Sequence, residues 1–216
     1  FFGVVISLLA YELGMLLKKK FGLPIFNPLL ISIAVVIVFL AVFDIDYQNY
    51  NDGAKYLSYL LTPATVCLAI PLYEQMEALK KNIKAILAGI LSGVLTSLTV
   101  VLALALIFNL NHKMYVTLLP KSITTAIGMG VSEELGGAVT ITVAVIIITG
   151  VLGNMLAETL CKLFHIEEPI AKGISIGSAS HAIGTAKAME MGDVEGAMSS
   201  LSIAVAGILT VVGASI

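Results

Sequence analysis

Long runs of apolar residues without a charge dominate the pattern along this chain. The runs 27–43, 85–108 and 138–157 approach or exceed the roughly 20 residues with which a helix crosses about 30 Å of hydrocarbon. Apolar positions follow one another directly in these runs, whereas the strands of a membrane β-barrel alternate between apolar and polar residues. The pattern therefore predicts an all-α integral membrane protein.

Polar and charged positions divide the chain into eight apolar segments. Lysines follow the first segment and precede the fourth, and an acidic loop follows the second. The predicted segments cover residues 1–17, 29–43, 55–73, 83–108, 114–133, 138–164, 170–191 and 194–216. We therefore expect a helical bundle of about seven or eight membrane segments.

Three of these segments, 55–73, 114–133 and 170–191, place proline or glycine beside serine and threonine near their middle. Proline removes a helical hydrogen bond and glycine lowers helix propensity, so we expect these helices to break there. Irregular backbone is tolerated at membrane depth only where it is buried in protein or lines a wet cavity. The alternative is that small residues merely allow helices to pack closely, as we expect for Gly89 and Gly93.

A weak internal repeat relates two of the broken segments. TPATVCLAIP at 62–71 aligns with GSASHAIGTA at 177–186, and each precedes a short amphipathic stretch and a long helix rich in Gly, Ala and Ser. Paired interrupted helices in corresponding halves of a chain point to the binding site of a transporter. We therefore predict two inverted repeats, 1–110 and 111–216, whose discontinuous helices cross near the middle of the membrane.

The positions of the lysines indicate the course of the segment 114–133. If every segment spans the membrane, the positive-inside rule is violated, because Lys162 and Lys172 then lie outside. If the segment 114–133 instead enters and returns on one face, both lysines join the inner set, and only Lys55, Lys113 and Lys187 remain near the outer face. We favour this re-entrant course.

Composition and charge narrow the function further. Of the 216 residues, 58% are hydrophobic and only 12% are charged, and the formal net charge of −2 gives no reason to expect a nucleic-acid partner. Cys67 and Cys161 lie in or beside apolar runs and lack metal-binding or redox spacing, so we expect no metal and no other cofactor. Catalytic motifs do not occur in their required context, which argues against an enzyme.

His181 is the first candidate for chemistry, because an ionisable residue inside a membrane is costly unless it has a partner or a function. Ser178, Ser180 and Thr185 flank it, and helical spacing places Ser178 and Thr185 near its face. We expect these four residues to bind substrate, and His181 to hold or pass a proton. The alternative is a neutral histidine that is bonded to a backbone carbonyl.

Lys121 is the second candidate. It follows Pro120 and precedes Ser122, Thr124 and Thr125. In a re-entrant segment Lys121 would point into the site and attract an anion, with the three hydroxyl groups as companions. Near a spanning helix end it would instead extend its amine to the interface.

Four further polar residues have ordinary structural explanations. Glu133 and Glu134 close the segment 114–133, and they either support the site or lie in a solvated loop. Asn27 precedes Pro28 and fits a helix cap or a bend, unless it supports the site. We expect Glu158 to lie near an interface beside Lys162.

Four stretches of the chain carry a resemblance to a known family: FNPLLISI (26–33), LTPATVCLAIPLYEQ (61–75), PKSITTAIGMGVSEELGG (120–137) and SASHAIGTAKAMEMGDVEGAMSSL (178–201). With them the chain resembles the LrgB/CidB/YohK family of bacterial membrane proteins over nearly its whole length. SEELGG and SHAIGTA are the most specific parts of the match.

The resemblance implies two alternative functions in a bacterial cell membrane. In one, the protein is an antiholin-like regulator of a small holin-like partner, LrgA or CidA, in the control of murein hydrolase activity, autolysis and programmed cell death. In the other, the pair moves small carboxylates such as pyruvate, and a similar plant protein exchanges glycolate and glycerate across the chloroplast envelope. A transporter can cause the first phenotype indirectly, through carbon overflow and the proton gradient.

We expect transport of a small monocarboxylate, with a homo- or hetero-oligomer in the lipid bilayer. Helix N-termini carry partial positive charge, so two opposed half-helices can hold a carboxylate with few formal charges. The predicted substrate-binding residues are Thr62, Pro63, Thr65, Lys121, Ser122, Thr124, Thr125, Ser178, Ser180, His181 and Thr185. The supporting residues are Asn27, Glu133 and Glu134.

Overall fold

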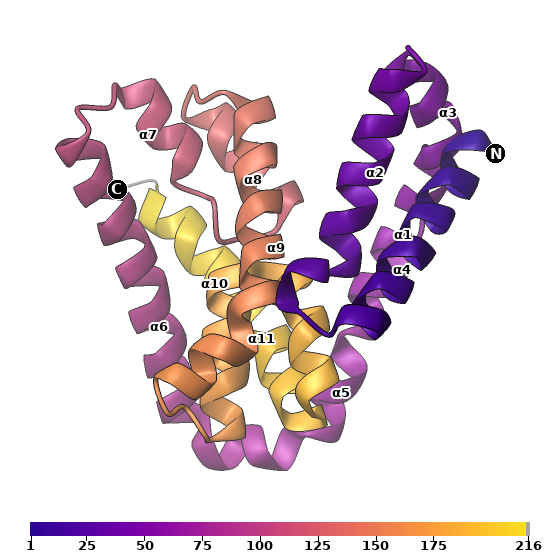
Figure 1. The fold of residues 1–216 in the computed structure, drawn as a ribbon. Helices are drawn as coiled ribbons and strands as arrows, with labels where there is room; N and C mark the ends of the chain where they lie inside the picture. The colour runs from indigo at the N-terminus through magenta and orange to yellow at the C-terminus, as the bar shows by residue number, and fades with distance from the viewer. Residues whose placement is uncertain (215–216) are drawn as a thin grey trace. The chain divides into compact units, whose positions relative to one another are not determined.

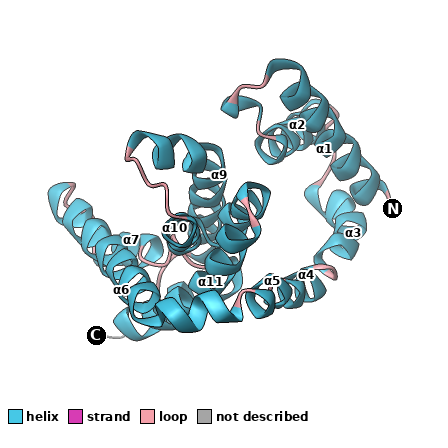
Figure 2. Ribbon diagram, turned by 90° about the horizontal axis from the view of Figure 1, so that it is seen from below, coloured by secondary structure: helices cyan, strands magenta, loops and turns pink. Residues whose placement is uncertain are grey.

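The computed structural model describes residues 1–214, apart from the side chains of Pro24, Leu61, Thr62 and Thr65. Every regular element in this part is helical, and Figures 1 and 2 show only helices and their connecting loops, which confirms the predicted all-α class. The described helices form two compact units, Phe1–Cys67 and Leu68–Ile216. The expected division into repeats 1–110 and 111–216 stays a prediction.

The first unit contains four α-helices and one 3-10 helix. These are α1 (Phe2–Phe21), η1 (Pro24–Phe26), α2 (Pro28–Val42), α3 (Tyr47–Ser58) and α4 (Leu61–Cys67). Helix α1 packs on α2 and α3. Gly3 and Gly14 make this packing possible, because a Cβ on either residue would collide with the backbone of α3 or of Pro28.

Asn27 lies directly before helix α2, where the sequence predicts a helix cap or a bend. Its side-chain oxygen accepts hydrogen bonds from the backbone N–H groups of Leu29, at 2.9 Å, and Leu30, at 3.2 Å. Pro28 occupies the first helical position, where a missing N–H costs nothing. Asn27 is therefore a helix cap.

The segment 55–73 is interrupted, as the sequence predicts. Helix α3 ends at Ser58, α4 covers Leu61–Cys67, and α5 (Ala69–Glu74) begins the second unit. Pro63 lies exposed in the first turn of α4. The predicted Thr62 and Thr65 side chains lie outside the described residues.

The second unit is built on three long helices, α6 (Met76–Ile107), α9 (Val139–Leu163) and α11 (Asp193–Ala214). By length and composition these three are apolar enough to cross a membrane, and α2 is a shorter apolar helix. The protein is therefore a membrane protein, while the expected total of seven or eight segments stays a prediction. An apolar core joins α6 and α11 to helix α10 (Pro169–Met191), around Ile90, Ile174 and Met198.

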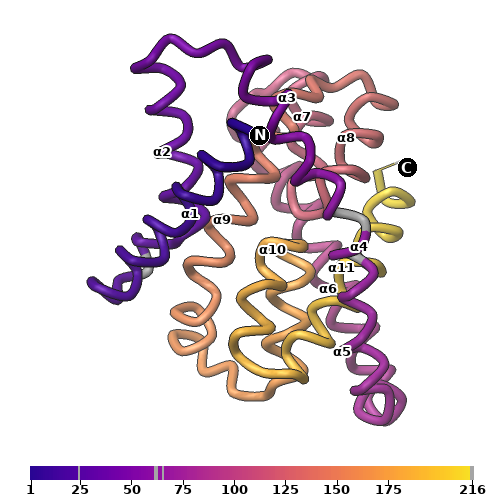
Figure 3. Tube along the Cα trace, turned by 90° about the vertical axis from the view of Figure 1, so that its right-hand side faces the viewer, coloured from indigo at the N-terminus to yellow at the C-terminus, as the bar shows by residue number. Residues whose placement is uncertain are grey.

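Two short helices, α7 (His112–Leu118) and α8 (Thr125–Glu134), lie between α6 and α9. Residues 119–124 between them are not helical, which confirms the break expected in this segment. Figures 1 and 3 show that α6 ends, and α9 begins, at the same end of the second unit. The α7–α8 hairpin therefore enters and leaves on one side, which is the re-entrant course that the lysines indicate.

Helix α10 breaks at His181, where φ is 42° and ψ is −144°. The chain then reverses, and residues 182–191 return beside residues 169–180 (Figures 1 and 3). Ile176 of the first arm packs with Ala188 of the second, and a Cβ built on Gly184 would lie 3.4 Å from the Ile176 carbonyl oxygen. The predicted break is confirmed, but within the second unit this helix folds back as a hairpin instead of crossing.

This reversal changes one expected lysine position. Because both arms of the α10 hairpin end at the same side, Lys187 lies beside Lys162, and the two share the Glu158 carboxylate. The prediction that Lys187 lies near the face opposite Lys162 was therefore wrong. The error follows from treating the segment 170–191 as a single crossing.

Candidate functional site

A cavity of about 980 Å³ opens between α6, α9 and the first arm of α10. The tips of both hairpins reach it from opposite ends of the unit: Lys121 and Ser122 from the α7–α8 hairpin, Ser178 and Ser180 from the α10 hairpin. These four residues belong to the site predicted from the sequence. The structure therefore brings together the charged and the hydroxyl-bearing parts of two segments that lie far apart along the chain.

Lys121 supplies the positive charge of this cavity. Its amine donates to the Ser122 hydroxyl at 2.9 Å and lies 3.5 Å from the hydroxyl of Ser97 in α6. The two serine hydroxyls are 3.2 Å apart. Among the described residues no carboxylate lies within 4.0 Å of the amine, and Glu168 is the one carboxylate that lines the cavity. The arrangement is suited to a single anionic group.

His181 turns its ring away from the cavity. Its Nε2 lies 3.0 Å from the carbonyl oxygen of Ile146 in α9, which requires the proton on that nitrogen. The side chain is 3% exposed, and a Cβ on Gly150 would collide with its ring. This contact is the one described by the alternative explanation, a neutral histidine bonded to a backbone carbonyl.

Thr185 also has its partners within the protein. Its hydroxyl donates to the His181 carbonyl at 3.0 Å and lies 2.7 Å from the hydroxyl of Ser199 in α11. Thr185 is fully buried and does not line the cavity. Like His181, it stabilises the turn of the hairpin.

The two serines of the α10 hairpin differ. Ser178 donates its hydroxyl to the Ile174 carbonyl at 2.7 Å. The Ser180 hydroxyl has no hydrogen-bond partner among the described residues, and although the residue is only 4% exposed, this oxygen is not fully enclosed. It fits against α9 because Gly153 has no Cβ, which would otherwise overlap it. Ser180 is thus the hairpin hydroxyl available to a bound molecule.

The other predicted residues of the second unit with described side chains do not line this cavity. Thr124 precedes α8 without a side-chain capping bond, and Thr125 begins that helix. Glu133 and Glu134 are exposed at its end, as a solvated loop would place them. Asn27 and Pro63 belong to the other unit, where Asn27 caps α2.

Helices α6 and α9 contribute lining residues that the sequence did not single out for binding. In α6 the positions Gly89, Gly93 and Ser97 follow one another at helical spacing along the cavity. A Cβ on Gly89 would contact Ile174, and one on Gly93 would lie 2.9 Å from the Ser178 hydroxyl oxygen, so the predicted packing role is confirmed. The recurrence of small residues every fourth position was the available signal for Ser97.

Comparison with known proteins assigns the chain to a family. A model of the LrgB-like family matches residues 7–216. The chain belongs to the LrgB-like family. This LrgB-like chain is 41% identical to the antiholin-like protein LrgB of Bacillus mycoides (strain KBAB4) over 213 residues, which cover 98% of the chain and 93% of that protein. The antiholin-like proteins LrgB of Bacillus cereus (strain B4264) and Bacillus anthracis (strain CDC 684 / NRRL 3495) match to the same extent. No solved structure matches the chain.

Proposed function

We propose that this LrgB-like protein is a multi-pass transporter of small monocarboxylates, of the size of pyruvate or glycolate, in the bacterial plasma membrane. The observation that carries the proposal is Lys121, a half-buried lysine without a carboxylate partner among the described residues, at the point where two hairpin tips meet one cavity. An ammonium group removed from water is costly unless an opposite charge compensates it. A carboxylate substrate supplies that charge.

The polar groups around Lys121 suit a carboxylate. The hydroxyls of Ser97, Ser122 and Ser180 can donate to its oxygens in place of water. The second helix of each hairpin begins at the tip, α8 after Thr124 and the returning arm of α10 after His181. Helix N-termini carry partial positive charge, which favours an anion between the two tips. Among the described residues Lys121 is the one cation that lines the cavity, which favours a monoanion over a dianion.

The names of the relatives support a second candidate function. The similar Bacillus proteins are named antiholin-like. On this basis we infer that the chain acts with a holin-like membrane protein of the LrgA/CidA type and so influences murein hydrolase activity and autolysis. In the alternative, the chain binds and regulates that partner without transporting anything.

Uptake into proteoliposomes separates the two functions. The purified chain is reconstituted with and without a holin-like partner, and entry of labelled pyruvate and glycolate is followed over time. Transport is supported if uptake is saturable and if excess unlabelled monocarboxylate suppresses it. Succinate, a dicarboxylate, should suppress uptake less. Faster uptake under an imposed proton gradient would add proton coupling.

The regulator function predicts a different result in the same experiment. Uptake would stay at the level of empty liposomes in every preparation, while the partner co-purifies stably with the chain. That combination would contradict the transport proposal.

A further inference from the structure

The cavity beside Lys121 is larger than a three-carbon acid requires. Its volume of about 980 Å³ lies at the upper end of the roughly 300–1,000 Å³ that is typical of pockets for drug-sized ligands. Lys121 and the hydroxyls of Ser97 and Ser122 form one polar group within it. The rest of the cavity is left for whatever is attached to the carboxylate.

The cavity is a long groove. Its α6 wall runs from Ser97 back to Asn82, so at a rise of about 1.5 Å per residue its ends lie about 22 Å apart. Gly93 meets Ser178 and Gly89 meets Ile174 along this wall, about 6 Å and 12 Å from the level of Ser97. The groove therefore leads from the Lys121 group toward the start of α10.

Beyond the Lys121 group the walls of the groove are largely apolar. Leu152, Leu156 and Leu160 recur at helical spacing along α9, and Ile170 and Ile174 line the groove from α10. The three leucines remain between 41% and 49% exposed. They offer apolar surface that the tail of a bound molecule could cover.

The serine hydroxyls along the same stretch already donate within their own helices. Ser92 donates to the Gly89 carbonyl at 2.8 Å, and Ser175 donates to the Lys172 carbonyl at 2.9 Å. Ser178 is bonded in the same way. These serines therefore do not require a polar ligand group beside them.

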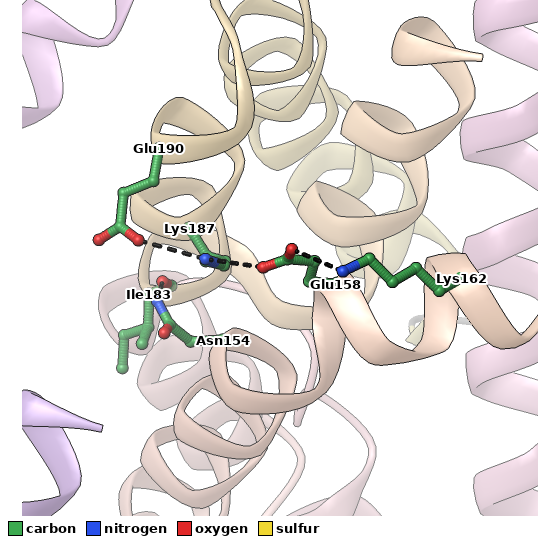
Figure 4. Close-up of polar contacts among 6 residues, drawn as sticks. All are labelled: Asn154, Glu158, Lys162, Ile183, Lys187 and Glu190. Atoms are coloured by element: carbon green, nitrogen blue, oxygen red, sulfur yellow. Dashed lines mark hydrogen bonds and ion pairs between the residues drawn. The ribbon is translucent and has the colours of Figure 1, made fainter. Parts of the chain in front are cut away.

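The charges place the carboxylate of a bound molecule at the Lys121 end. Glu168 lines the opposite end, directly before α10, and its like charge disfavours a carboxylate there. The other charged residues of α9 and of the returning arm of α10 pair with one another outside this cavity (Figure 4): Glu158, Lys162, Lys187 and Glu190. One carboxylate on an apolar tail fits this distribution.

We propose that the groove selects monocarboxylates that carry an unbranched apolar tail, and that it binds them more tightly than pyruvate. The carboxylate lies at Lys121, and the tail extends past Gly93 and Leu156 toward Gly89. The inference rests on the proposed function, because it uses the same carboxylate site and names the class of substrate. Each methylene that the open groove covers should tighten binding about two- to threefold.

Equilibrium dialysis measures this dependence without relying on transport. The purified full chain in detergent is titrated with labelled butanoate, hexanoate and octanoate, and binding to chain-free micelles is subtracted. Each added pair of methylenes should lower the Kd about three- to tenfold. Excess pyruvate should displace octanoate, whereas octanamide, which has the same tail without the charge, should not.

A matched pair of variants in α9 tests the path of the tail. Leu156→Gln places a polar group in the groove, so the Kd for octanoate should rise about five- to tenfold, and that for butanoate much less. Ile148→Gln is the control, because Ile148 is 57% exposed in the same helix and does not line the cavity. Its Kd for octanoate should equal that of the unmodified chain.

Three results would overturn the inference. A Kd that is independent of tail length, or absent binding of all three acids, would show that the groove does not hold the tail. Displacement of octanoate by octanamide would show that the groove takes apolar chains, such as those of lipids, without regard to charge. Equal effects of Leu156→Gln and Ile148→Gln would show that the tail does not lie along Leu156.

Uptake of pyruvate and glycolate into proteoliposomes is measured in parallel. Tail-dependent binding without uptake of any acid would contradict the transport proposal and leave this inference standing. Pyruvate uptake together with a Kd that is independent of tail length would contradict the inference alone.

Discussion

The two hairpins of the second unit reach the same cavity, but the side chains at their tips differ in charge. The tip of the α7–α8 hairpin carries Lys121, whose charge no described carboxylate balances. The described tip of the α10 hairpin carries no charged side chain at the cavity. The ring N–H of His181 there donates to the backbone carbonyl of Ile146. The first hairpin thus brings a positive charge to the cavity, whereas the second brings a close-fitting wall of small residues.

The hairpins also differ in how they are fastened to α9. A row of hydroxyl contacts ties the first hairpin to the start of α9, because the Thr142 hydroxyl donates to the Thr117 carbonyl at 2.9 Å and lies 2.7 Å from the hydroxyl of Ser132. The second hairpin meets α9 through Gly150 and Gly153, through Ala157, which packs on its two arms, and through the buried bond from His181 to a carbonyl of α9. Buried hydrogen-bonding groups are costly to leave unpaired, so these polar contacts hold both hairpins against α9.

The largest expected effect comes from removing the charge of the first tip. Lys121→Gln keeps a donor of similar length but loses the cation, and hydrogen bonds to charged groups contribute about 1.5–3 kcal/mol. The KM for pyruvate uptake should rise about 10- to 100-fold. Lys113→Gln is the matched control, because Lys113 is exposed in the same hairpin. An equal rise of KM in both variants would show that Lys121 does not bind the substrate.

A side chain at Gly153 should disrupt the close packing of the α10 tip against α9. In Gly153→Ala the added Cβ overlaps the Ser180 side chain, and such overpacking costs about 1–3 kcal/mol. The melting temperature in detergent should fall. Gly130→Ala in α8 is the control, because nothing lies within 4 Å of a Cβ there. Unchanged stability in Gly153→Ala would mean that α9 and α10 are not in contact at this point.

His181 should affect stability more than substrate affinity. His181→Phe keeps a ring but loses the bond to Ile146, at a cost of about 1 kcal/mol. His165 also has a positive φ but is exposed, so His165→Phe is the control for a phenylalanine at a positive φ without a lost bond. A lower melting temperature for His181→Phe alone, with a KM close to that of the unmodified chain, is expected. A raised KM at an unchanged melting temperature would instead show that His181 contributes to substrate binding.

The smallest effect should separate two serines on the same arm. Ser180→Ala removes a cavity hydroxyl with no described partner, so substrate affinity should fall by about 0.5–1.5 kcal/mol. Ser178→Ala removes a hydroxyl that already donates to the Ile174 carbonyl, and its KM should stay unchanged. Equal KM values for both variants would show that the α10 tip serves only as a wall.

Local chemistry made much of the fold predictable. Uncharged apolar runs require helices in a membrane, because backbone polar groups must bond within the segment. Prolines, glycines and hydroxyl residues marked the breaks around Lys121 and His181, and the cap at Asn27 followed from its place before Pro28. The same signals brought Lys121, Ser122, Ser178 and Ser180 into the candidate site. These features depend on neighbours in sequence, which the sequence displays.

The direction that α10 takes after its break was not predictable in this way. A break at His181 is compatible with a helix that continues across and with one that folds back, since the local backbone change is similar in both. Packing of Ile176 on Ala188, and of both arms on α9 and α11, selects the return. The misplaced Lys187 follows from this one undetermined choice.

The sequence by itself determined the helical class and the sites of the breaks, it favoured the re-entrant course before α9, and it offered Lys121 as one of two candidates for chemistry. Only the tertiary structure decided that α10 returns, that Ser97 completes the group around Lys121, and that Glu158 pairs with Lys187. The reason is physical. Helix formation and interruption are set by side chains a few residues apart, whereas a cavity or an ion pair between helices depends on distances that only the packing of remote segments establishes.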